Sequence, residues 1–86
     1  MLFRSYPNPF NPITNIRYDI PEATDVKIEI YNLAGKKVKT LVSREHQPGR
    51  YKAQWNATNE YGSIVSTGMY IYKIRAKGFV SVKKLL

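Results

Sequence analysis

The residues of this chain best suited to acid–base or metal chemistry are one histidine and six carboxylates. His46 follows Glu45 in the polar stretch Ser43–Pro48, which we expect to be an exposed loop. Zinc sites use several histidine, cysteine or carboxylate ligands, and the chain has no cysteine and no second histidine. The carboxylates are scattered among basic residues, and no nucleophilic serine motif occurs. We therefore expect a protein that is not an enzyme and that binds no metal or cofactor.

The segment Asn56–Gly68 offers one further ligand hypothesis. Asn56, Asn59 and Glu60 present oxygen atoms at a spacing that a calcium loop could use. Two of these three side chains are neutral amides, which lowers the negative charge that a hard cation needs. Asparagine side chains also accept hydrogen bonds from nearby backbone N–H groups in Asx turns. We expect such turns, rather than a metal ion, to order this loop.

Aromatic residues at alternate positions suggest a second kind of chemistry, the stacking of sugar rings. Tyr51 and Trp55 lie in one segment, and Tyr70 and Tyr72 lie in another. A carbohydrate-binding accessory module could use them as an exposed platform. Alternating aromatic residues on strands more often build the core. We expect Trp55 to be buried, with Tyr51 and Tyr72 nearby.

The elements that position these residues are predicted by alternation of apolar and polar side chains, which is typical of half-buried strands. Ile16–Ile20, Val26–Ile30, Tyr51–Trp55 and Tyr70–Ala76 all show it. Turn residues separate the runs, among them Gly35 in the hairpin connection 32–36. About seven short strands and no helical period predict an all-β antiparallel sandwich over residues 13–86.

Size and charge limit the function classes. The chain has 86 residues, enough for one domain, and its net charge is +8. Most lysines and arginines alternate with apolar residues, as on the solvated face of a sheet, and no recognition helix or arginine-rich arm accompanies them. No apolar run is long enough to cross a bilayer. We expect a monomer with no nucleic-acid partner and no stable membrane insertion.

Residues 1–12 form a proline-rich lead-in. Pro7, Pro9 and Pro12 each fix their own φ angle and lack a backbone donor, and each disfavours helical geometry in the preceding residue. Asn8 lies between two of them. The sequence predicts a rigid, extended strap that precedes the sandwich.

This strap and the strands after it resemble the type A C-terminal sorting domain of the type IX (Por) secretion system of Gram-negative bacteria. The resemblance covers nearly the whole chain in order and spacing, and it includes Tyr6–Pro12, Ile13–Pro21, Val26–Val38, Pro48–Tyr51, Trp55–Asn56, Ser66–Ile74 and Lys83–Leu85. It implies an immunoglobulin-like sandwich that acts as a sorting signal. The parent protein would pass through the periplasm and the outer-membrane translocon to the cell surface or beyond. A sortase-like surface protease would then remove the domain.

The resemblance also implies which residues the translocon recognises. The strongest candidates are at the C-terminal tip, followed by the start of the preceding strand and then by the strap; they are Lys83, Lys84, Leu85, Leu86, Gly68, Tyr70, Pro7, Asn8 and Pro9. By the same resemblance, a signal peptide would lie upstream of Met1.

One alternative is a structural module like the immunoglobulin-like domain of the flagellar hook-capping protein, which is similar around Asn32–Gly35, Trp55–Asn56 and Gly68–Tyr70. That alternative does not account for the proline-rich entry or for the Lys-Lys-apolar end. The carbohydrate-binding module is the other alternative.

Overall fold

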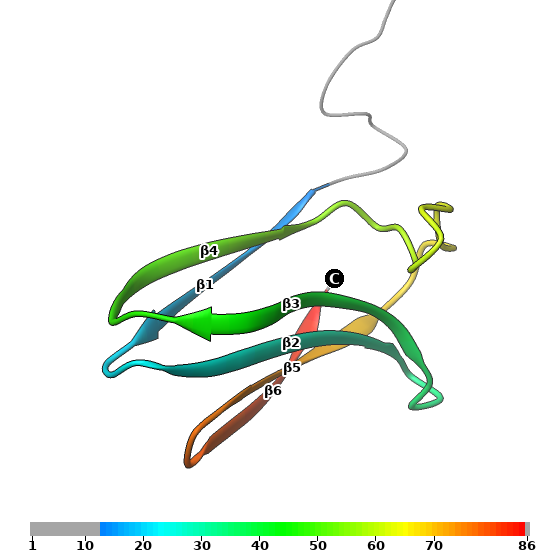
Figure 1. Ribbon diagram of the computed structural model, residues 1–86. Coiled ribbons are helices and arrows are strands. Elements are labelled where there is room, and N and C mark those ends of the chain that lie inside the picture. Colours follow the sequence, from blue (N-terminus) through cyan, green and yellow to red (C-terminus); the bar gives the residue numbers. More distant parts are fainter. Residues whose placement is uncertain (1–12, 86) are drawn as a thin grey trace, which may run out of the picture.

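The computed structural model describes residues 13–85, which form two antiparallel sheets and no helix (Figure 1). The strands are β1 (Thr14–Ile20), β2 (Thr24–Asn32), β3 (Lys37–His46), β4 (Gly49–Trp55), β5 (Tyr70–Ala76) and β6 (Phe79–Leu85). The predicted all-β sandwich is confirmed. Within the described range there are six strands rather than about seven. The strap, residues 1–12, lies outside that range.

The two layers differ in width. One sheet has the strand order β3-β2-β5-β6, and the other contains only β1 and β4. Antiparallel pairing of β1 with β4 runs from Thr14 opposite Trp55 to Ile20 opposite Gly49, so this small sheet joins segments far apart in sequence. The chain crosses between the layers from β1 to β2, from β3 to β4 and from β4 to β5 (Figure 1).

Alternating apolar side chains of both sheets meet between the layers and form the core. Ile16 and Ile20 of β1 face the β2 residues Val26, Ile28 and Ile30, and all five are buried. Ala53, Trp55, Ile74 and Leu85 complete the buried set. The predicted alternation therefore gives the correct inward face of β1, β2 and β4.

Two tight connections use glycine at a positive φ angle. Gly35 has φ 84° in the β2–β3 connection, where the Asn32 Oδ1 atom accepts hydrogen bonds from the N–H groups of Ala34 and Lys36. Gly78 has φ 68° between β5 and β6. Only glycine adopts this backbone region at little cost, which makes both hairpins compact.

The prediction that His46 lies in an exposed loop is wrong. β3 extends to His46, and only 1% of this residue is exposed. Its ring packs against two tyrosines of the other sheet, with ring centroids 5.6 Å from Tyr18 and 4.5 Å from Tyr51. These contacts bury a histidine at the end of a polar stretch of sequence.

Candidate recognition surface

The predicted recognition tip is the end of β6, the outer strand of the four-stranded sheet. Lys83 pairs in register with Tyr72, and Lys84 with Ile71. Both lysines are exposed and, as neighbours on a strand, project to opposite faces. Leu85 is only 6% exposed and belongs to the core. Leu86 lies outside the described residues.

Two of the other predicted residues, Tyr70 and Gly68, lie close to this tip. Tyr70, the first residue of β5, pairs with Leu85. Its hydroxyl donates a hydrogen bond of 2.6 Å to the Ser66 carbonyl oxygen. Gly68 is exposed just before β5. Pro7, Asn8 and Pro9 lie outside the described residues.

Trp55 is buried as predicted, with 4% of the residue exposed. Its Nε1–H donates to the Thr58 carbonyl oxygen over 2.9 Å, and its ring meets the ring of Tyr70 edge-on at 5.1 Å. Tyr51 instead stacks on Tyr18. Because Trp55 faces the core, these aromatic residues do not form one exposed platform for a sugar.

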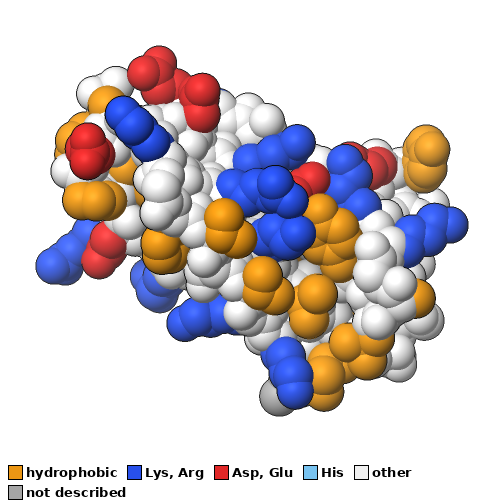
Figure 2. Space-filling model, turned by 90° about the horizontal axis from the view of Figure 1, so that it is seen from below, with side chains coloured by type: hydrophobic (Ala, Val, Ile, Leu, Met, Phe, Trp, Pro, Cys, Tyr) orange, Lys and Arg blue, Asp and Glu red, His pale blue; other side chains and the backbone are white. Residues whose placement is uncertain are grey.

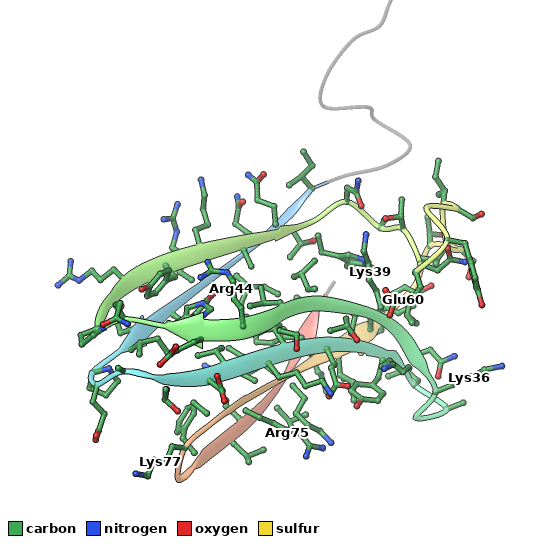
Figure 3. The ribbon with its side chains drawn as sticks, viewed as in Figure 1. Lys36, Lys39, Arg44, Glu60, Arg75 and Lys77 are labelled. Atoms are coloured by element: carbon green, nitrogen blue, oxygen red, sulfur yellow. The ribbon has the colours of Figure 1, made fainter. Side chains whose placement is uncertain are left out.

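The segment after β4 is ordered by asparagine side chains, as expected. The Asn59 Oδ1 atom accepts hydrogen bonds from the N–H groups of Tyr61 and Ser63. The Asn56 Oδ1 atom accepts a hydrogen bond from the Thr58 hydroxyl, to which the Lys39 Nζ atom in turn donates. Figure 3 shows Lys39 and Glu60 on this side of the molecule. The Lys39 ammonium group therefore lies beside Asn56, one of the three residues considered as calcium ligands.

A buried carboxylate lies at the centre of the outer face of the four-stranded sheet, and sequence analysis did not identify it. Glu29 is 6% exposed. Its Oε2 atom lies 3.8 Å from the Nζ atoms of Lys27 and Lys37, and its Oε1 atom lies 4.0 Å from Nε of Arg75. Figure 2 shows lysine and arginine side chains gathered on this face beside hydrophobic ones, and Figure 3 shows Arg75 pointing away from the two-stranded sheet.

Tyr31 belongs to the same cluster. Its hydroxyl donates to Glu29 Oε1 over 3.0 Å, and the Lys73 Nζ atom lies 5.2 Å from its ring centroid. Burial, and then the hydrogen bond to Glu29, raise the pKa of Tyr31 above its usual value. The Glu29 carboxylate is thus paired with three cationic side chains, and a fourth, Lys73, joins the cluster through the ring of Tyr31.

A groove of about 490 Å³ opens where the narrow sheet leaves the wide one uncovered. Tyr18 and Ile20 of β1 form one wall, and Tyr72, Phe79 and Lys83 line the side of β5 and β6. The predicted recognition strand therefore borders a groove on its inner side.

The model of one protein family, described as the secretion system C-terminal sorting domain, matches residues 4–86. This chain belongs to that family. The match spans the sandwich and most of the lead-in, and it confirms the resemblance to the type IX sorting domain. Comparison of the sorting domain with curated proteins and with solved structures gave no significant match.

Membership has direct consequences for the parent protein. A type IX sorting domain implies that the protein which carries it is exported and that the domain interacts with the secretion machinery.

Among residues 13–85, no helix could span a membrane. In the same range, no group of three or more histidine, aspartate and glutamate side chains is placed to hold a metal ion.

Proposed function

We propose that this domain is a non-catalytic sorting signal and that the outer-membrane translocon of the type IX system recognises it at the end of β6. The parent protein crosses the periplasm, passes through the translocon and reaches the cell surface or the medium. A sortase-like surface protease then separates the parent from the domain. The domain acts as a folded monomer.

The placement of Lys83 and Lys84 supports this proposal most directly. Both side chains are exposed, and within residues 13–85 all three ion pairs converge on Glu29 and involve neither lysine. Exposed charges of this kind contribute little to stability. A pair of adjacent cations that the fold does not use is available to a partner.

Leu85 plays a different part from the lysines in this proposal. Because its side chain is buried opposite Tyr70, it fixes the end of β6 in the sheet and is not a surface contact of the folded domain. Leu85 would position the two lysines, and they would make the contact.

The test uses a periplasmic reporter enzyme with its own signal peptide, fused ahead of residues 1–86 in a bacterium that has a type IX system. We expect the fusion to reach the cell surface or medium, and the reporter without the domain to stay in the periplasm. A strain without the translocon should retain both. Surface delivery of the reporter without this domain would contradict the proposed function.

A further inference from the structure

Among residues 13–85, the outer strand β6 presents an open edge that carries bulky apolar side chains. It pairs with β5 along Phe79–Leu85, and no described strand lies on its other side. Val80 is 63% exposed and Val82 is 54% exposed. Proteins usually protect such edges, because unpaired backbone groups beside apolar side chains invite pairing with another chain.

The opposite edge of the same sheet is protected in a way that β6 is not. The pairing of β3 with β2 has register shifts between Ile28 and Glu29 and between Ile30 and Tyr31. Bulges of this kind bend and twist an edge strand, which makes it a poor template for a further strand. The register of β6 with β5 is uninterrupted. Of the two edges of the four-stranded sheet, only that of β6 is therefore regular.

The register also indicates which backbone groups face outward. Ala76 and Phe79 flank the loop Lys77–Gly78 as a pair, and in such a tight hairpin the flanking residues form the hydrogen-bonded pair. Hydrogen-bonded and non-hydrogen-bonded pairs alternate along antiparallel strands. The N–H and C=O groups of Val80, Val82 and Lys84 consequently point away from β5, toward the open edge.

Charge and side-chain type indicate the partner. Lys83 and Lys84 stand at the end of this edge, and the chain carries a net charge of +8, so a second copy would be repelled. Membrane-interface surfaces favour tryptophan and tyrosine, whereas this edge offers valines. An extended segment with apolar residues and carboxylates matches both features.

We propose that β6 binds an extended segment of a partner protein as an added strand. Val80 and Val82 contact apolar residues of that segment, and Lys83 and Lys84 pair with its carboxylates. Main-chain hydrogen bonds give such a complex its affinity, and alternate side chains give its specificity. The inference rests on the proposed function in one respect: the translocon supplies the segment.

The first measurement is amide hydrogen exchange of the full chain with and without purified outer-membrane type IX translocon. We expect exchange at Val80, Val82 and Lys84 to slow on binding by at least about tenfold. The amides of Lys52 and Gln54, on β4 in the other sheet, should not change.

The second measurement uses two substitutions of one residue. Val82→Pro removes an outward-facing donor from an edge strand, where proline is tolerated. Val82→Thr keeps that donor and the β-branched shape. We expect Val82→Pro to weaken binding to the purified translocon by at least about tenfold and Val82→Thr by less than about threefold. Circular dichroism checks that both variants fold. If Val82→Pro does not fold, the hydrogen-exchange measurement on the wild-type chain decides the question.

The outcomes separate this inference from the proposed function. Tight binding with unchanged exchange along β6 would overturn strand addition and leave the sorting function intact. Slow exchange at the same amides in the free chain would also overturn it, because the edge would already be occupied. A folded wild-type chain that does not bind the translocon would defeat the proposed function and the inference together.

Discussion

The Tyr18 hydroxyl oxygen lies 2.8 Å from the Nε2 atom of His46, and this hydrogen bond joins the two sheets. The His46 Nδ1 atom lies 3.1 Å from the Arg44 carbonyl oxygen, which can only accept. Nδ1 therefore carries a proton, and in the neutral ring Nε2 accepts from Tyr18. A buried imidazole thus has both nitrogens satisfied, one from its own strand and one from the other layer.

Tyr18→Phe should lower the free energy of unfolding by about 1–3 kcal/mol, because it leaves the buried His46 Nε2 atom without a donor. Urea denaturation measures the change. Tyr51→Phe is the matched control: the Tyr51 hydroxyl donates to the Gln47 carbonyl oxygen at an exposed position, where water can replace it. A larger loss for Tyr51→Phe than for Tyr18→Phe would contradict the role of the cross-sheet bond.

Alkaline pH should reduce the stability that this Tyr18–His46 hydrogen bond provides. Burial is the largest cause that raises the pKa of Tyr18 above its usual value of 10.0. The Tyr18 hydroxyl therefore keeps its proton to higher pH in the folded chain than in the unfolded chain. The contribution of Tyr18 to stability is complete below pH 10.0 and is lost as pH rises through the pKa of Tyr18 in the folded chain. The free energy of unfolding should fall more steeply above pH 10.0 in the wild type than in Tyr18→Phe. Parallel curves would show that Tyr18 does not titrate in this way.

Trp55→Ala should lower the free energy of unfolding by about 3–5 kcal/mol, since it removes a large buried ring and leaves a cavity beside Tyr70. Trp55 is the one tryptophan of the chain, so fluorescence reports its surroundings alone. The folded spectrum should peak at shorter wavelength than that of free tryptophan and shift to longer wavelength on unfolding. An unshifted spectrum in the folded state would contradict the burial.

Sequence alternation predicted most of the fold, and its failures have physical causes. The inward residues of β1, β2 and β4 follow a simple period of two, and Trp55 follows the same rule. His46 does not, because its burial depends on Tyr18, which is 28 residues away and in the other sheet. Glu29 occupies an outward position of β2, and only the pairing with β3 and β5 surrounds it with cations. Contacts between distant strands are invisible in a local pattern.

Glu29→Gln should lower the free energy of unfolding by about 1–2 kcal/mol, because it keeps the shape of the side chain but removes the negative charge among Lys27, Lys37 and Arg75. Added salt should narrow the difference from wild type by screening the repulsion among these cations. Glu22→Gln changes the net charge equally at an exposed position and should have little effect. Equal losses in the two variants would show that net charge, and not the cluster, sets the stability.

The export function depends most directly on Lys83 and Lys84. Replacing both with alanine should change the free energy of unfolding by less than about 0.5 kcal/mol, because both side chains are exposed on an edge strand. A reporter fused ahead of this variant should nevertheless accumulate in the periplasm while the domain stays folded by circular dichroism. A loss of export without a loss of stability is expected only if a partner recognises these charges.

The matched control is the double variant Lys36→Ala and Lys52→Ala, which removes the same charge at two exposed positions away from β6. It should be exported like the wild type. Equal retention of both double variants would mean that net charge steers the domain to the translocon without a specific site. Normal surface delivery of the folded Lys83 and Lys84 variant would remove these two lysines from the recognition site, even if the domain as a whole remained necessary for export.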